Sequence, residues 1–185
     1  YEQISIPSIT GTGPERTIMF KTESSYSDTA EINFSSNIEN YVVQFDGAKY
    51  ITFDKIKITS PGFTNYQSTY GRCIEIFNGA ENIAIKHCRI TGSTETSHLS
   101  DDMAIIYCGS SFCNDISFDH NNIENGSWSV YIEGQGAFGD EELFNICIEN
   151  NVISGFAYKG IYMKDQKNPV VRKNIISYSP TPVSQ

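Results

Sequence analysis

The chain has 185 residues and is acidic, with 22 Asp and Glu against 13 Lys and Arg and a formal net charge of −9. This charge, without any Lys/Arg cluster, argues against nucleic acid as a partner, and no apolar run approaches the roughly 18 to 20 residues that a membrane-spanning helix needs. Charged residues make up only 19% of the chain, whereas Tyr and Phe occur 11 times each, so the composition favours β structure with polar turns.

Short strand-like segments recur along the chain in two series. The first series comprises "TIMFK" (17–21), "VVQFDG" (42–47), "CIEIFNG" (73–79), "AIIYCG" (104–109), "SVYIEG" (129–134) and "GIYMKD" (160–165). The second comprises "ITFDKIKITS", "IAIKHCRITGS", "ISFDHNNIENG", "ICIENNVISGF" and "PVVRKNIISYS", which start at 51, 83, 116, 146 and 169. The starts of this second series are 32, 33, 30 and 23 residues apart. No apolar pattern of helical period separates the segments, and self-similarity at such a period predicts stacked repeats.

Strand alternation assigns faces within the first series. We expect one inward column, made of Phe20, Phe45, Ile76, Ile106, Ile132 and Met163. The matching outward column would be Met19, Gln44, Glu75, Ile105, Tyr131 and Tyr162. Asp46, Tyr107, Glu133 and Lys164 would flank that outward column.

The repeats place three asparagines, Asn121, Asn151 and Asn174, at one position, which Cys88 and Ile56 occupy in the preceding repeats. Equivalent residues of stacked coils lie about 4.8 Å apart, so inward amides there would form a structural ladder and bond backbone groups at the bend. The neighbouring Asp119 and His120 would lie on a turn edge, beside Lys86 and His87, as solvated polar groups.

The segments "EQISIPSITGTGPERTIMFKTES" and "YVVQFDGAKYITFDKIKITS", with repeats of the form N-x-I-x-x-N-x-I at 82–90, 115–123 and 145–153, carry a resemblance. They resemble the right-handed parallel β-helix of the pectate-lyase-like superfamily, and more narrowly the β-helix segments of large secreted or surface proteins of bacteria. The resemblance covers roughly residues 3 to 178. It implies an all-β fold, a right-handed single-stranded parallel β-helix (solenoid) of about six coils with three short strands per coil.

One domain over 1–178 and a Pro/Ser tail over 179–185 are expected, in a piece of a larger protein with further domains. The resemblance also implies a secreted or cell-surface location. Members of the superfamily include lyases, polygalacturonases, adhesins and passive stalks, so the fold alone does not choose a function. Cys108 and Cys113 would either close a small disulfide loop in an oxidising compartment or serve, like the other three cysteines, as small buried hydrophobes.

In this superfamily the substrate groove runs along the sheet of the first strands, between loops. Insertions at 60–72, 92–102 and 135–142 would supply such loops. Five tyrosines could offer flat apolar rings with a hydroxyl to a sugar. They are Tyr66, Tyr70, Tyr107, Tyr131 and Tyr162. The alternative is that they merely cover a sheet face.

Asp101 and Asp102 match the Asp pair that polygalacturonases carry before this strand, and Glu75 lies one coil earlier. Glycoside hydrolysis needs an acid and a base, but the family's further Asp and His have no counterpart here. A lyase would use Arg72 or Lys164 as the base. Its calcium ion could take oxygen ligands from Asp101, Asp102, Glu75 and Asp46. The alternative is that Asp101 and Asp102 only bond backbone amides at a turn.

We therefore expect an extracellular carbohydrate-facing or adhesive module without a complete catalytic constellation. Its partner would be a polysaccharide or cell-surface glycan, and calcium is the one cofactor considered. The alternatives are a polysaccharide lyase or glycoside hydrolase, and a structural spacer of a surface protein.

Overall fold

The computed structural model describes residues 2–23, 29–35, 37–64, 69–94, 100–109, 112–134 and 143–178. In this part of the chain almost all regular structure is β-strand, and the only helix is one 3₁₀ turn, η1 (Asp101–Met103). No helix among these residues is long and apolar enough to cross a membrane. The expected tail over 179–185 lies outside the described residues.

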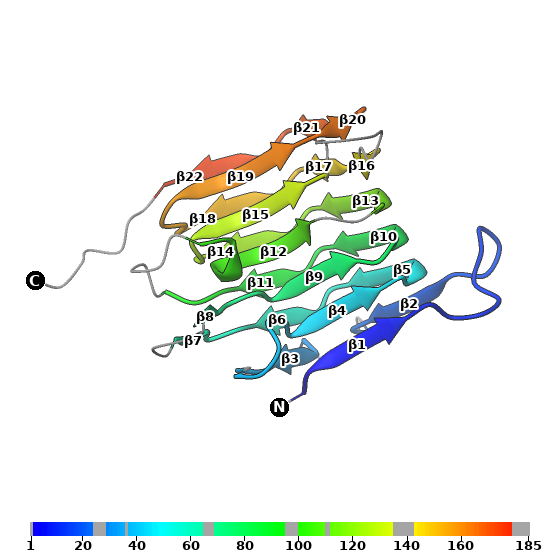
Figure 1. Cartoon of the computed structure of the whole chain (residues 1–185), viewed down its shortest axis with the longest axis horizontal. Coiled ribbons are helices and arrows are strands. Elements are labelled where there is room, and N and C mark those ends of the chain that lie inside the picture. Colours follow the sequence, from blue (N-terminus) through cyan, green and yellow to red (C-terminus); the bar gives the residue numbers. More distant parts are fainter. Residues whose placement is uncertain are drawn as a thin grey trace, which may run out of the picture.

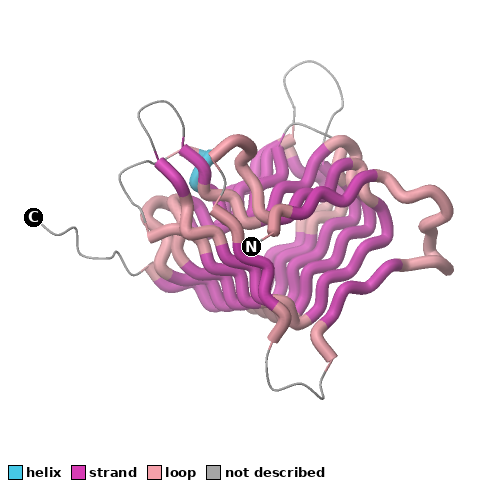
Figure 2. Tube along the Cα trace, turned by 90° about the horizontal axis from the view of Figure 1, so that it is seen from below, coloured by secondary structure: helices cyan, strands magenta, loops and turns pink. Residues whose placement is uncertain are grey.

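Three parallel sheets form the walls of the molecule, and each coil contributes to all three in the same order (Figures 1 and 2). The first sheet contains β1 (Ile4–Pro7), β4 (Val43–Asp46), β9 (Ile74–Phe77), β12 (Ala104–Gly109), β15 (Trp128–Glu133) and β19 (Lys159–Lys164). The third sheet contains β3 (Glu31–Asn33), β6 (Lys57–Thr59), β11 (Arg89–Thr91), β14 (Asn122–Glu124), β18 (Val152–Ser154) and β22 (Ile175–Ser177).

The second sheet lies between these two along the chain. It contains β2 (Ile18–Lys21), β5 (Lys49–Asp54), β10 (Glu81–Lys86) and β13 (Asn114–Asp119), then the split strands β16 (Leu143–Phe144) with β17 (Cys147–Glu149) and β20 (Gln166–Lys167) with β21 (Val170–Arg172). An antiparallel hairpin, β7 (Phe63–Thr64) and β8 (Thr69–Tyr70), projects from the second coil. The predicted parallel β-helix of about six coils with three strands per coil is therefore confirmed.

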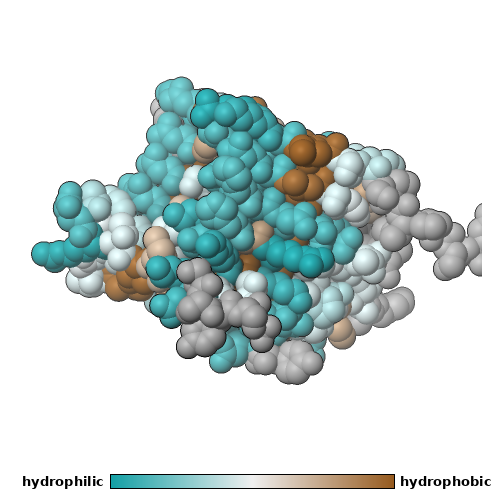
Figure 3. Space-filling model, turned by 180° about the vertical axis from the view of Figure 1, so that it is seen from behind, coloured by the Kyte–Doolittle hydropathy of each residue, from teal (hydrophilic) through white to brown (hydrophobic). Residues whose placement is uncertain are grey.

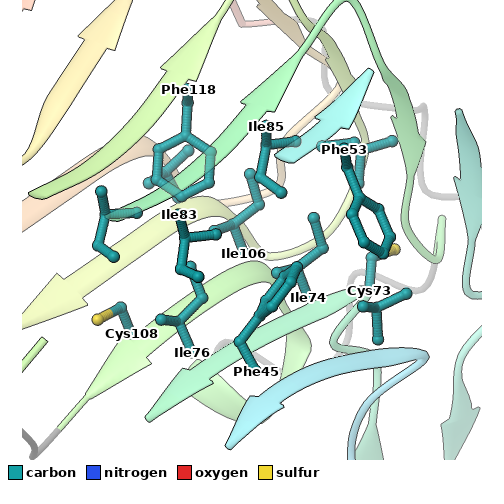
Figure 4. Close-up of a cluster of buried hydrophobic side chains, with 14 of the residues drawn as sticks. Phe45, Phe53, Cys73, Ile74, Ile76, Ile83, Ile85, Ile106, Cys108 and Phe118 are labelled. Atoms are coloured by element: carbon teal, nitrogen blue, oxygen red, sulfur yellow. The ribbon is translucent and has the colours of Figure 1, made fainter. Parts of the chain in front are cut away.

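The core consists of apolar columns that run from coil to coil inside the three sheets (Figure 4). In the first sheet the register joins Ile6, Phe45, Ile76, Cys108, Ile132 and Met163 in one inward column. The expected column was wrong at two positions. Phe20 belongs to β2 in the second sheet, where it pairs with Phe53, and Ile106 lies in the adjacent inward column, opposite Ile74.

The error at Ile106 has a physical cause in the neighbouring residue. Ile105 is fully buried although it does not belong to the inward alternation of β12. The backbones of Gly92 and Gly126 cover it, since a Cβ at either position would lie 2.6 to 2.7 Å from Ile105 Cγ1. Two consecutive buried isoleucines hide the strand period, so alternation alone gave the wrong register.

The three repeated asparagines are hydrogen-bonded in series. Asn151 Nδ2 donates to Asn174 Oδ1 at 3.0 Å, and Asn121 Nδ2 donates to Asn151 Oδ1 at 3.0 Å. Each Oδ1 also accepts the backbone N–H of the asparagine in the preceding coil, at 2.8 and 2.9 Å. Asn121 Oδ1 accepts the N–H of Cys88, where the column changes from amide to thiol.

None of the five cysteines forms a disulfide, so the expected alternative of a Cys108–Cys113 loop is absent from the structure. Cys73, Cys88, Cys108 and Cys113 are buried, and burial raises the pKa of Cys73 to about 12. The thiols of Cys108 and Cys113 are in hydrogen-bond contact, and this contact together with burial raises the pKa of Cys108.

The outer surface seen in Figure 3 is mainly hydrophilic, with small hydrophobic patches. Large apolar side chains are exposed chiefly in the first and last coils, for example Met19, Phe20, Val171, Ile175 and Ile176. Polar side chains thus cover most of the middle coils, while the two end coils leave part of the apolar columns in contact with solvent.

Candidate functional site

The outward column of the first sheet carries a polar or aromatic side chain in every coil. The register joins Ser5, Gln44, Glu75, Tyr107, Tyr131 and Tyr162 in this column. Met19 lies on the second sheet instead, and Ile105 is buried, so both were wrongly assigned to the column. Tyr107, expected beside the column, is one of its members.

Three tyrosines of successive coils stack on one another. The ring centroids of Tyr107 and Tyr131 lie 5.5 Å apart at an interplanar angle of 11°, and those of Tyr131 and Tyr162 lie 4.8 Å apart at 26°. All three side chains are half-buried. Since the faces of Tyr131 are covered by its two neighbours, this ring can offer an edge, but not a flat face, to a ligand.

Trp128 packs edge-on beneath this row. Its ring makes T-shaped contacts with Tyr131, Tyr158 and Tyr162 at centroid distances of 5.2, 4.8 and 5.1 Å. The ammonium of Lys159 lies 4.9 to 5.0 Å from the rings of Trp128, Tyr158 and Tyr162. In the part of the chain that the structure describes, Trp128 Nε1 is buried without a hydrogen-bond partner.

Arg72 closes the other end of the tyrosine row. Its guanidinium carbon lies 3.4 Å from the ring centroid of Tyr107, and its Nη1 donates to Glu75 Oε1 at 2.7 Å. Its Nη2 contacts Asp101 Oδ2 at 3.3 Å and Asp102 Oδ1 at 3.4 Å. Only 11% of the Arg72 side chain is exposed, so this cation is held by stacking and by three carboxylates together.

Asn40 fixes the backbone that presents Arg72. Its Oδ1 accepts the N–H groups of Gly71 and Arg72 at 2.7 and 3.1 Å, and its Nδ2 donates to the carbonyl of Asp102 at 2.8 Å. One side chain from the second coil thus ties the end of the 60–72 insertion to η1. Sequence reasoning did not single out Asn40, since no repeat or motif marks it.

The catalytic candidates Glu75, Asp101 and Asp102 come together, but around a cation. Each of the three carboxylates contacts the guanidinium of Arg72, and Ser100 Oγ accepts the N–H of Asp102 at 3.2 Å as the cap of η1. Among the described residues, no three His, Cys, Asp or Glu side chains are grouped so as to hold a metal ion. Glu75, Asp101 and Asp102, suggested by the sequence as calcium ligands, are thus not grouped in that way, and the guanidinium among them would repel calcium.

A second ion pair, between Lys164 and Glu133, lies where strands β19 and β15 end. The Tyr131 hydroxyl donates to Glu133, and Lys164 Nζ donates to Glu133 Oε1 at 2.6 Å. The hydrogen bonds from Lys164 and from Tyr131 hold the pKa of Glu133 below its usual range. Burial and the Glu133 carboxylate raise the pKa of Tyr131, so its hydroxyl remains protonated and able to donate.

The other tyrosine candidates do not join this row. Tyr70 lies on β8 and packs against Phe63, at a centroid distance of 6.2 Å. Tyr66 lies outside the described residues, as does the 135–142 insertion. Conversely, Tyr158 and Lys159, which the sequence analysis did not single out, contact Trp128 and belong to the aromatic cluster.

No protein-family model matches the sequence, and comparisons with curated proteins and with solved structures likewise give no match. The parallel β-helix therefore rests on the strand topology alone, and the aromatic row of the first sheet stands as the candidate site on its geometry.

Proposed function

We propose that this protein is a non-catalytic, secreted or cell-surface module that binds polysaccharide along the outer face of the first sheet. The observation that carries this proposal is the row formed by Tyr107, Tyr131 and Tyr162. Their hydroxyl-bearing edges repeat at the spacing of the coils, which is comparable to the length of one pyranose unit. A glycan lying parallel to the solenoid axis would meet one such edge per sugar.

Aromatic side chains with a polar tip suit sugars, since carbohydrate rings present both C–H and O–H groups. Tyr158, which is 48% exposed, adds an accessible ring at the end of the row. The resemblance of the repeats to the pectate-lyase-like superfamily supports a carbohydrate partner, and the superfamily groove runs along this same sheet. Further domains of a parent chain would complete a surface protein of this kind.

The absence of catalysis is proposed from the state of the carboxylates. A glycosidase acid must be able to hold a proton and a base must be unpaired, whereas Glu75, Asp101 and Asp102 share one guanidinium. The guanidinium of Arg72 is engaged by the same three carboxylates, which opposes a role as a base.

Trp128 provides the assay, because it is the only tryptophan of the chain and contacts Tyr131 and Tyr162. We expect that at least one polysaccharide in a panel of plant, algal and bacterial polymers changes the fluorescence of Trp128. The same polysaccharide should retard the protein in affinity electrophoresis. Combining Tyr131→Ala with Tyr162→Ala should weaken retention at least about tenfold, which is about 1.4 kcal/mol.

The matched control is Tyr178→Ala, because Tyr178 is an exposed tyrosine next to Phe156, outside the row. Replacing Tyr131 and Tyr162 by Phe keeps the stacked rings but removes the two hydroxyls. The change in retention then measures what the hydroxyls contribute to polysaccharide binding. Retention that the Ala pair leaves unchanged, in a protein whose circular dichroism is native, would refute the binding row. Failure of every polysaccharide to bind would leave the spacer function.

The second candidate is a polysaccharide lyase or hydrolase. It is favoured by the meeting of Glu75, Asp101, Asp102 and Arg72 beside the tyrosine row. Incubation of the same polysaccharides with calcium and with chelator, followed by mass spectrometry, tests it. Unsaturated products would show a lyase and saturated products a hydrolase, and either should disappear in Asp101→Asn with Asp102→Asn.

A further inference from the structure

Two histidines lie next to each other at the turn between the second and third sheets. Lys55, His87, His120, Asn150 and Lys173 directly follow the second-sheet strands of successive coils, and all adopt positive φ angles of 52° to 58°. This backbone conformation is uncommon for residues other than glycine, and Asn and His are among those that adopt it most often. The turn therefore presents a column of side chains outside the apolar core.

The two imidazole rings face each other across adjacent coils. Their centroids are 5.4 Å apart at an interplanar angle of 32°, and the side chains of His87 and His120 are 47% and 55% exposed. Both rings are thus close to one another and open to solvent, with room to rotate about their side-chain bonds.

Each ring is oriented by a carboxylate. His87 Nδ1 lies 2.8 Å from Asp54 Oδ1, and His120 Nδ1 lies 2.9 Å from Asp119 Oδ1. Asn150 Nδ2 in turn donates to Asp119 Oδ1 at 2.8 Å. A carboxylate only accepts, so the neutral imidazole places its one N–H on Nδ1 and leaves the lone pair on Nε2. Nε2 lies on the far side of the ring from the carboxylate.

This pairing is the arrangement that orients histidine ligands in metal sites, where the second ring nitrogen donates to a carboxylate. We propose that His87 and His120 bind one borderline divalent transition-metal ion, such as Cu²⁺, Ni²⁺ or Zn²⁺, through their Nε2 atoms. Asp54 and Asp119 act as positioning residues. The inference is independent of the tyrosine row on the first sheet.

The geometry of the coils suits such an ion. Adjacent coils are about 4.8 Å apart, whereas two nitrogens that each bind one ion at about 2.0 to 2.1 Å lie about 3 Å apart. The two rings, whose centroids are 5.4 Å apart, would have to rotate about their side-chain bonds to bring both Nε2 atoms onto one ion. Calcium and magnesium take oxygen ligands and would not select this pair, whereas imidazole suits copper, nickel and zinc.

The site holds two protein ligands, with water completing the coordination, since no group of three or more His, Cys, Asp or Glu occurs among the described residues. Lys86 lies between Asp54 and Asp119 in the register of the second sheet. Its charge opposes that of the two carboxylates and favours a site of modest affinity.

Titration calorimetry with each metal salt alone tests the proposal on the whole chain. We expect one ion per chain, and at least about tenfold weaker binding for His87→Asn and for His120→Asn. Asparagine is the matched replacement because Asn150 occupies the same turn position at a φ of 55°. His98→Asn, at the remaining histidine of the sequence, is the control and should leave the affinity unchanged.

Two further measurements separate a metal site from a solvated turn. Asp54→Asn and Asp119→Asn keep both ligands and should weaken binding by about tenfold. Long-range ¹H–¹⁵N spectra of the metal-free protein should show both histidines as the Nδ1–H tautomer. The proposal would be overturned if the unaltered protein bound no metal, or if His87→Asn and His120→Asn bound the metal as tightly as the unaltered protein. The Nε2–H tautomer at both rings would also overturn it.

Discussion

Replacing Asn151 by Ala tests the amide column in the core. The Asn151 side chain is fully buried and takes part in four hydrogen bonds. It donates to the carbonyl of Phe118 at 2.9 Å and to Asn174 Oδ1 at 3.0 Å, and it accepts from the backbone and side-chain nitrogens of Asn121 at 2.8 and 3.0 Å. At about 1 kcal/mol for each bond, the substitution should lower the free energy of unfolding by about 4 kcal/mol.

Equilibrium unfolding in urea, followed by circular dichroism, measures this loss. The matched control is Asn122→Ala, at the next residue, because Asn122 is only half-buried and its side chain donates to Glu124 on the surface. We expect the control to cost less than about 0.5 kcal/mol, as is usual for surface substitutions. A cost of Asn151→Ala equal to that of Asn122→Ala would refute the reasoning that buried amide bonds hold the last coils together.

Three further predictions concern pH, the core and Arg72. The hydrogen bond from Lys164 lowers the pKa of Glu133 from 4.5, so this carboxylate stabilises the fold above about pH 4.5 and the contribution is lost as the pH falls through the lowered value. Urea unfolding should show Glu133→Gln less stable than the unaltered protein by under about 1 kcal/mol at pH 7, with a difference that shrinks as the pH falls below 4.5. Phe118→Ala should cost about 3 to 5 kcal/mol, whereas Val171→Ala, in the same column but 47% exposed, should cost under about 1 kcal/mol; similar losses would contradict the assigned core. Arg72→Met should lower the free energy of unfolding by about 3 kcal/mol at neutral pH, because the three carboxylates then repel one another. A thermal unfolding midpoint of this variant that does not approach that of the unaltered protein in acid would argue against that cause.

The repeat of the second and third strands could be predicted accurately from the sequence. Ile51, Ile83 and Ile116 align as expected from the spacing of their segments, and Lys86 pairs with Asp119 as placed. Each of these segments combines an apolar alternation with a polar turn, so it has only one register that buries the isoleucines. A slip by one residue would expose all of them.

The first sheet was harder to predict. In the first coil its strand is "ISIP", Ile4–Pro7, whereas "TIMFK", which looks equally strand-like, forms the second-sheet strand. In the fourth coil, Ile105 and Ile106 are both buried, so the alternation did not decide which neighbour points outward. The placement of Tyr107 in the aromatic row therefore required the hydrogen-bonded register of β12 with β9 and β15.

The candidate site followed the sequence only in part. Tyr131 and Tyr162 share a column as the spacing indicated, and Glu75, Asp101 and Asp102 do meet at one point. Their meeting around Arg72, however, depends on the ends of the insertions at 60–72 and 92–102, which lie outside the repeated strand segments. It also depends on Asn40, which lies 31 residues before Gly71. The spacing of residues predicts which side chains are neighbours only where the structure repeats. Contacts made by loops that do not repeat cannot be predicted in this way.

The sequence by itself determined the architecture, an all-β solenoid of about six coils with three strands per coil. Repeated segments stack on copies of themselves, so local pattern and long-range contact specify the same residues. Only the tertiary structure decided how charged and aromatic groups combine on the outer surface. Those contacts join residues of different coils and loops, such as Arg72 with Asp101 and His87 with His120, and their energies depend on distances that no single repeat encodes.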